Sequence, residues 1–432
     1  MVANALFIRS LSSRVRRFTA WQPLAVGDFR MLWLGQSVSI LGDQFYLVAL
    51  PWLVLYLTGS GLVLGAVMLT ATVPRVVFQL VGGATSDRIS PHKLMLASSV
   101  FRALVCGLLT VLVLLGVVKL WHIYVIAAAF GTADAFFAPA FRSFIPTVLD
   151  KENLIAGNAL LQGSSVLTKL IGPSLAGLLI PIFGTGMAFG LDTGSFIFVA
   201  ACLLMIRRTR LPERVAEQGV AQADKAKLNM LSSIREGISY TLKEPVLRSL
   251  IIIISAVEFA FAGPFTVGLA SLADVKFATG PTAFGAMLST LGGGLLLGTF
   301  IAGSVKAKLS MKGIVIPCAV ALSVGLTLLG LVPNVVWACI VIAAVGVVAG
   351  FLQVVVAAWL QTCSAPHMLG RVMSVVMLCA YGLTPLSYVL TGALTQISVS
   401  FMFIVTGSSL LVVLAICALG WAGRTLETQQ PQ

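Results

Sequence analysis

The chain has 432 residues, of which 58% are hydrophobic and only 10% are charged. This composition is too apolar for a water-soluble protein of that length, so it predicts an integral membrane protein. The net charge of +13 needs no nucleic acid as a partner, because basic residues beside a membrane face anionic lipid heads. We therefore expect contact with the lipid bilayer and none with nucleic acid.

Twelve apolar stretches along the chain are about 18 to 25 residues long, the length needed to cross the hydrocarbon core as a helix. Several contain Gly or Pro, which membrane helices accept when neighbouring helices approach closely. The predicted fold class is an all-α integral membrane protein with twelve transmembrane helices. The stretches begin near Met31, Leu62, Leu94, Trp121, Leu154, Gly186, Leu247, Thr282, Lys312, Val335, Met368 and Phe401.

Basic residues gather in every second connecting segment. Of the 28 Lys and Arg residues, only Lys119 and Lys276 fall on the other side, and Arg75, Arg102 and Lys169 fall within predicted spans. Positively charged flanks of membrane helices are retained in the cytoplasm. We therefore predict a multi-pass protein of the cell membrane, plasma or inner, with both termini in the cytoplasm.

A long polar interval, from Arg207 to about Glu244, divides the twelve stretches six and six. Its second half, LNMLSSIREGISYTLKEPVL, has apolar residues three and four apart, which indicates an amphipathic helix on the inner membrane face. The two halves resemble each other weakly, so two pseudo-symmetric six-helix bundles with a site between them are expected. The predicted parts are a basic cytoplasmic segment 1–28, an N-terminal bundle 29–206, a linker 207–245, a C-terminal bundle 246–422 and a cytoplasmic tail 423–432.

Acidic residues within the apolar stretches are candidates for function. Placing an ionised group at mid-bilayer costs at least about 2.5 to 3.5 kcal/mol. Such groups therefore usually form ion pairs, face a cavity or take part in the function of the protein. Asp134 and Glu258 lie near the middle of predicted spans and are candidate proton carriers. Asp43 is either a third functional carboxyl group or a helix-packing group.

Basic residues within the spans give a second set of candidates. Lys169 and Arg75 are candidates for ion pairs with these carboxylates or for binding an anionic substrate. Arg102 and Asp192 lie nearer the ends of their predicted spans, and we expect them to be structural.

Enzymatic machinery is not indicated. The seven cysteines lie in or beside apolar stretches without a CxxC motif, so we expect packing roles and no metal or cofactor. No GxxxxGK[ST] motif and no Ser/His/Asp constellation occurs, so we predict that the chain is not an enzyme. Energy for any transport would come from an ion gradient or from the substrate itself.

Short motifs in the chain resemble the major facilitator superfamily of transporters. The GxxxDR pattern of Gly83, Asp87 and Arg88, followed by His92 and Lys93, resembles the loop between that family's second and third helices. The phrases FRMLWLGQSVSILGDQF, FFAPAFRSFIPTVLDKENLIAGNAL and IREGISYTLKEPVLR resemble the branch with enterobactin exporters and macrolide efflux proteins. The chain departs from the loop pattern at two positions, Ser90 and Pro91, and its second-half copy lacks the Asp-Arg pair.

The resemblance implies two groups of functional residues. The first is a conformational latch on the cytoplasmic side, for which a simple positive-inside turn is the alternative. The second is a partial antiporter-type helix-kink motif, which packing alone explains equally well. The latch comprises Gly83, Asp87, Arg88, Lys93 and Arg371, and the kink motif comprises Gly163, Gly172, Pro173 and Gly177.

The function expected is a secondary active exporter of a small amphipathic molecule, drug-like or siderophore-like, working as a monomer by proton antiport with alternating access. A proton-independent facilitator or importer of a small molecule is the alternative within transport. A membrane receptor or lipid-handling scaffold that does not transport is the alternative from another class.

Overall fold

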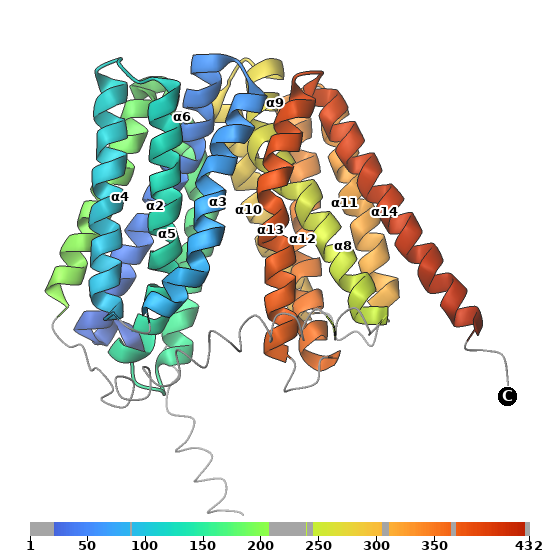
Figure 1. Cartoon of the computed structure of the whole chain (residues 1–432), viewed down its shortest axis with the longest axis horizontal. Helices are drawn as coiled ribbons and strands as arrows, with labels where there is room; N and C mark the ends of the chain where they lie inside the picture. Colours follow the sequence, from blue (N-terminus) through green and yellow to red (C-terminus); the bar gives the residue numbers. More distant parts are fainter. Residues whose placement is uncertain are drawn as a thin grey trace, which may run out of the picture.

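The computed structural model of the chain describes residues 21–86, 89–206, 239, 245–304, 311–363 and 369–427. These residues form helices joined by short turns, and no strand occurs among them (Figure 1). The helices are η1 (Gln22–Ala25), α2 (Gly27–Thr58), α3 (Gly61–Ser86), α4 (Pro91–Leu114), α5 (Leu120–Val148), α6 (Leu154–Met205), α8 (Pro245–Gly263), the π-helix η2 (Pro264–Gly268), α9 (Leu269–Lys276), α10 (Pro281–Ser304), α11 (Met311–Leu331), α12 (Val335–Cys363), α13 (Leu369–Thr395) and α14 (Val399–Glu427).

Ten of the helices in the described part of the chain are long and apolar enough to cross a membrane. The prediction of an all-helical membrane protein is therefore confirmed. A helix satisfies all of its backbone N–H and C=O groups internally, which is what a segment needs in lipid, where no water can bond them.

Helix α6 contains two of the expected apolar stretches, one on each side of a non-helical residue. The helical geometry is interrupted between them at Gly184, whose φ of 78° and ψ of 168° lie outside the helical region. Glycine adopts such a positive φ without the steric cost that a Cβ would bring. The expected sixth stretch, which begins near Gly186, is therefore the second part of α6 after this break.

The first helices pack together, as do the last ones. Helix α2 lies along α6 and α3 along α5, while α10 lies along α12 and α11 along α14. The most extensive contacts between these groups are those of α3 with α13 and of α6 with α10. We name the two ends of the molecule after their turns: the Ser60 end holds the turn between α2 and α3, and the Ser90 end holds the turn between α3 and α4.

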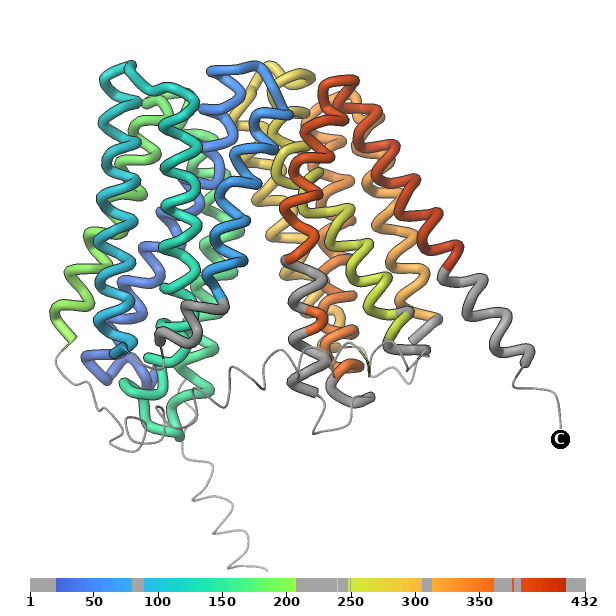
Figure 2. Tube along the Cα trace, in the orientation of Figure 1, coloured from blue at the N-terminus to red at the C-terminus, as the bar shows by residue number. Residues whose placement is uncertain are grey.

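Glycines bring the connecting helices into close contact. A Cβ added at Gly65 of α3 would collide with the carbonyl oxygen of Tyr388, and one at Gly392 of α13 would lie 2.6 Å from the Gly61 carbonyl oxygen. These contacts lie near the Ser60 end, where the coloured parts of α3 and α13 approach each other (Figure 2). Small residues commonly allow membrane helices to touch in this way.

Several predicted features fall outside the described residues. They are the N-terminal segment up to residue 20, the linker 207–244 with its amphipathic helix except for Ser239, the last residues 428–432, and Asp87 and Arg88 of the predicted latch.

Candidate functional site

A cavity of about 870 Å³ lies among helices α2 to α6. On α5 its lining spans 130–145 and on α6 it spans 158–169. These stretches lie between the middle of each helix and the Ser90 end, so the cavity occupies that half of the molecule. Thr266 of η2 and Tyr388 of α13 complete its wall. We name it the N-terminal cavity, and its volume is within the range of about 300–1,000 Å³ typical of small-molecule sites.

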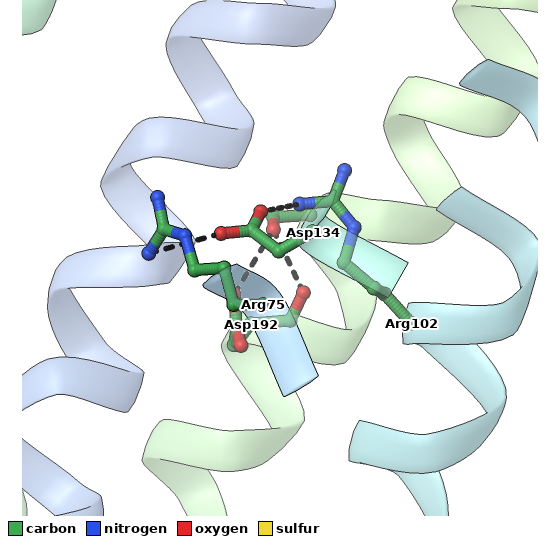
Figure 3. Close-up of polar contacts among 5 residues, drawn as sticks. Arg75, Arg102, Asp134 and Asp192 are labelled. Carbon is green, nitrogen blue, oxygen red and sulfur yellow. Dashed lines mark hydrogen bonds and ion pairs between the residues drawn. The ribbon is translucent and has the colours of Figure 1, made fainter. Parts of the chain in front are cut away.

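Asp134 of α5 lies between two arginines at this cavity. Its Oδ2 is 3.2 Å from Nη1 of Arg75 on α3, and its Oδ1 is 3.4 Å from Nη1 of Arg102 on α4 (Figure 3). The side chain of Arg75 is 54% exposed and that of Asp134 is 25% exposed. The carboxylate of Asp134 thus interacts with two guanidinium groups, one on α3 and one on α4, and both of these helices pack against α5.

Arg102 is enclosed by aromatic rings. Its guanidinium carbon lies 4.2 Å from the ring centre of Phe137 and 4.6 Å from that of Phe196. The residue is only 2% exposed, and its Nε and Nη2 atoms have no hydrogen-bond partner among the described residues. A cation over an aromatic face is stabilised by the ring quadrupole. The aromatic rings and Asp134 therefore offset part of the cost of burying this charge.

Two further aspartates belong to the same electrostatic environment. Asp43 of α2 interacts electrostatically with Arg102, Asp134, Arg75 and Lys169. Of these, Lys169 of α6 lines the cavity but makes no ion pair within the described residues. Of the two candidate ion-pair partners, Arg75 forms an ion pair with Asp134, and Lys169 forms none with it.

Asp192 of α6 is fully buried beside this group (Figure 3). Its carboxylate accepts hydrogen bonds of 3.4 Å from the thiol of Cys106 and from the hydroxyl of Ser195. Gly42 of α2 permits this packing, because a Cβ there would lie 2.7 Å from Asp192 Oδ1. Asp192 also interacts electrostatically with Arg102.

Glu258 of α8 does not join these charges. It lines a different cavity of about 390 Å³ among the C-terminal helices, which we name the C-terminal cavity. Thr266 and Tyr388 line both cavities and so lie between them. The sequence analysis gives Asp134 and Glu258 the same candidate role, but the two carboxylates lie at different cavities and have different neighbours.

Residues of the predicted kink motif lie at helix contacts in three of four cases. A Cβ at Gly172 would lie 2.6 Å from Cγ of Gln44, and one at Gly177 would lie 2.6 Å from the carbonyl oxygen of Pro281. The carbonyl oxygen of Pro173 would collide with a Cβ at Gly285 of α10. Gly163 is the exception, because a Cβ there would meet no atom within 4 Å.

Of the predicted latch residues, Gly83 lies in α3 and Arg371 in α13, while Lys93 is exposed in the first turn of α4. The neighbouring His92 is held at this end of α4 by a contact of 2.8 Å between its Nε2 and the carbonyl oxygen of Leu203.

Arg102 is the site residue that the sequence reasoning placed incorrectly. Helix α4 begins at Pro91, a residue favoured at the first helical position, and not at Leu94. Arg102 therefore lies at the middle of α4 rather than toward its end. The signal in the sequence is a single arginine near the middle of an apolar span, which needs an anionic partner.

Solved transporter structures share this fold. The nucleoside transporter NupG superposes with a TM-score of 0.70 at 12% identity, covering 91% of this chain and 98% of that one. A bacterial homologue of the iron transporter ferroportin, solved in an inward-facing state, superposes with a TM-score of 0.66 at 16% identity, covering 90% and 98%. At these identities the likeness concerns the fold alone.

Sequence relatives add the family. The multidrug efflux pump Tap of Mycolicibacterium fortuitum is 29% identical over 366 residues, which cover 82% of this chain and 86% of that protein. Macrolide efflux protein A of Streptococcus pyogenes is 22% identical over 402 residues, which cover 90% and 95%. The family described as transmembrane secretion effectors matches residues 18–428. This match spans nearly the whole sequence, so the chain belongs to the transmembrane secretion effector family of the major facilitator superfamily, a family of transporters and not of enzymes.

Proposed function

We propose that the protein is a secondary active exporter of drug-like amphipathic molecules that exchanges substrate for protons by alternating access. The named relatives, a multidrug efflux pump and a macrolide efflux protein, support the direction and the substrate class. The observation that carries the coupling is Asp134, a carboxylate at mid-helix that lies between two arginines and lines the N-terminal cavity.

The proposed architecture is twelve spans in two six-helix bundles, 29–206 and 246–422, joined by the cytoplasmic linker 207–245. We place both termini and the Ser90 end in the cytoplasm, because the basic residues concentrate there. The N-terminal cavity then opens toward the cytoplasm, while the glycine contacts of α3 with α13 and of α6 with α10 close the outer end. With this orientation, a drug can enter the N-terminal cavity from the cell interior.

A proton would act on Asp134 by changing its ion pairs. Protonation removes the negative charge that Arg75 and Arg102 share, and leaves two guanidinium groups without their closest anion. Asp43, which interacts electrostatically with both arginines, is then the next carboxylate available to them. A change of partner between α5 and α2 alters how α3 and α4 are held, and α3 carries one of the two outer contacts. In this proposal the charge state of Asp134 biases which end of the molecule is open.

The predicted cytoplasmic latch remains part of the proposal. A carboxylate at Asp87 would accept hydrogen bonds from the free amides at a helix N-terminus and stabilise its positive end. Asp87→Asn is expected to lower the transport rate while expression is unchanged. Equal rates for this variant and the wild type in proteoliposomes would leave the loop as a simple positive-inside turn.

The test of coupling is transport in proteoliposomes loaded with a pH-sensitive dye. Addition of a substrate from a panel of macrolides, lipophilic cations and siderophores should release protons from, or draw them into, the vesicles with the wild type. Asp134→Asn should abolish this substrate-driven proton movement. Asp274→Asn is the matched control, because Asp274 is an exposed carboxylate of α9 outside both cavities.

Two results would contradict the proposal. Substrate-driven proton movement that persists in Asp134→Asn would move the coupling away from this residue. Wild-type transport that is indifferent to an imposed pH gradient would indicate a facilitator instead of an antiporter.

A further inference from the structure

The C-terminal cavity has the character of a small-molecule site. It is surrounded by α8, η2, α10, α11, α12 and α13, and its volume is about 390 Å³. Its walls are mostly apolar, and four of the lining side chains carry a polar group: Glu258, Gln353, Thr266 and Tyr388. Mostly apolar walls with a few convergent polar groups are typical of sites that bind drug-sized molecules. The proton coupling proposed above makes no use of this cavity.

Glu258 is the only charged side chain among the described residues that line this cavity. It is exposed, and it has no basic partner in the described part of the chain, where both ion pairs involve Asp134. A carboxylate at membrane depth usually pairs, faces an aqueous cavity or functions. Glu258 thus faces an apolar cavity with a carboxyl group that has no ion-pair partner among the described residues.

Two aromatic rings lie beside this carboxylate on the same face of the helix. Phe261 follows Glu258 by three residues, which places both on one helical face. The rings of Phe261 and Phe265 stack with centres 5.0 Å apart and planes 14° apart, and both line the cavity. Phe265 belongs to the π-helix η2, and such wide turns occur frequently at functional sites. Aromatic faces attract cations and pack well against apolar groups.

The two cavities carry opposite charge. The N-terminal cavity is lined by four basic side chains, Arg75, Arg102, Arg142 and Lys169, against two acidic ones, Asp43 and Asp134. A lipophilic cation is repelled by such a lining and attracted by the single carboxylate of the C-terminal cavity. Thr266 and Tyr388, which hydrogen-bond to each other, form the wall shared by the two.

We propose that the C-terminal cavity binds the cationic part of a lipophilic substrate, with Glu258 as counter-ion and Phe261 and Phe265 packed against its apolar surface. The ligand class is a monovalent organic cation, such as a quaternary phosphonium or a protonated amine on an aromatic frame. This inference rests on the proposed export function, and it assigns proton binding and substrate binding to two different sites. The Asp134 group handles the proton, and the Glu258 cavity selects the substrate by charge.

The experiment compares two probes of similar shape and different charge. Tetraphenylphosphonium is a lipophilic cation, and triphenylphosphine oxide is a neutral analogue. Their binding to the full-length purified protein in lipid nanodiscs is measured by isothermal titration calorimetry. The wild type should bind the phosphonium ion more tightly than the oxide. Glu258→Gln should weaken phosphonium binding about tenfold, the loss expected for one partly desolvated charge contact, and leave oxide binding unchanged.

Two variants control for folding and for charge in general. Glu258→Asp keeps the carboxylate and should retain most of the preference for the phosphonium ion. Asp274→Asn removes one negative charge outside both cavities and should bind both probes as the wild type does. Equal binding of the phosphonium ion by Glu258→Gln and the wild type overturns the proposal. An equal loss of both probes, or binding of neither probe by the wild type, also overturns it.

Binding at equilibrium needs no proton gradient, so this result is separate from the coupling test. Charge-dependent binding at Glu258 can stand even where Asp134→Asn leaves proton movement intact. Conversely, antiport that depends on Asp134 can stand where Glu258→Gln does not alter the preference between the probes.

Discussion

Nη1 of Arg102 lies 3.4 Å from Oδ1 of Asp134, and this contact joins a fully enclosed cation to a carboxylate that faces a cavity. Arg75 reaches the other oxygen of Asp134 from a side chain that is 54% exposed. The two arginines are therefore not equivalent. Arg102 is fixed by the rings of Phe137 and Phe196, whereas Arg75 is free to exchange its carboxylate partner for water.

This difference predicts unequal effects on stability. Removing one member of a buried ion pair typically costs roughly 3–5 kcal/mol. Because Asp134 keeps Arg75 and is 25% exposed, we expect Arg102→Gln to lower the free energy of unfolding by about 1–3 kcal/mol. Arg75→Gln removes an exposed interaction, which is worth at most about 1 kcal/mol. Thermal unfolding of the purified variants in detergent measures both, and equal losses would contradict the distinction.

The α6–α10 contact predicts a result for the kink motif. Introducing a methyl group into a tightly packed contact typically costs about 1–3 kcal/mol. A Cβ at Gly177 would lie 2.6 Å from the carbonyl oxygen of Pro281, so Gly177→Ala should lower both thermal stability and transport rate. Gly163→Ala is the matched control on the same helix, because nothing lies within 4 Å of its added Cβ. It should be neutral or slightly stabilising, since Ala favours a helix over Gly by up to about 1 kcal/mol.

The opposite ranking would change the interpretation of α6. If Gly163→Ala were the damaging substitution, the functional contact would involve a surface that forms in another conformation, and not the Gly177 contact with α10.

The membrane helices could be predicted from the sequence because bilayer thickness sets their length and polarity. The stretches expected near Leu62, Trp121 and Val335 begin within a residue of the observed starts of α3, α5 and α12. The break in α6 at Gly184 falls between two stretches that the sequence separates, those that begin near Leu154 and Gly186. Regular local features were therefore the accessible part of the fold.

The site was only partly predictable, because its contacts join residues far apart in the chain. Asp134 and Arg75 were named from the cost of burying charge, and the structure places them together. Arg102 was predicted to be structural and near a span end, whereas it lies at the middle of α4 and contacts Asp134, which is 32 residues away in the sequence. Glu258 was grouped with Asp134 by charge type, although the rotation of α8 turns it toward a different cavity.

A hydrogen bond across α6 and α10 yields a further prediction. The amide N–H of Ser174, next to Pro173, donates to Oγ of Ser289 at 2.9 Å. Ser289 is buried, so Ser289→Ala leaves that N–H without this acceptor. Hydrogen bonds between membrane helices are worth about 0.6 kcal/mol on average, and we expect a loss of stability of that size. Thr290→Ala is the control, because the hydrogen bond of Thr290 lies within its own helix, to the Ala286 carbonyl oxygen. A larger loss for Thr290→Ala than for Ser289→Ala, in thermal unfolding, would argue against a role of the interhelical bond.

The closed Ser60 end gives a direct test of alternating access. The side-chain amide of Gln396 donates to Oγ of Ser60 at 3.0 Å, and this bond joins the turn after α13 to the turn before α3. A double substitution, Ser60→Cys with Gln396→Cys, places two thiols across this contact. A short bifunctional methanethiosulfonate should then connect them and reduce drug export in vesicles to the background rate.

Reduction with dithiothreitol should restore export in the same sample, because it removes only the covalent connection. Each single substitution and the wild type, treated with the same reagent, serve as controls for the native cysteines. Of these, Cys106 and Cys202 are buried. If opening at the Ser60 end is an obligatory step, the connected protein cannot release substrate there, whatever the proton gradient. Full export by the connected protein would show that α3 and α13 need not separate at this end, and would remove alternating access about the Ser60–Gln396 contact from the mechanism.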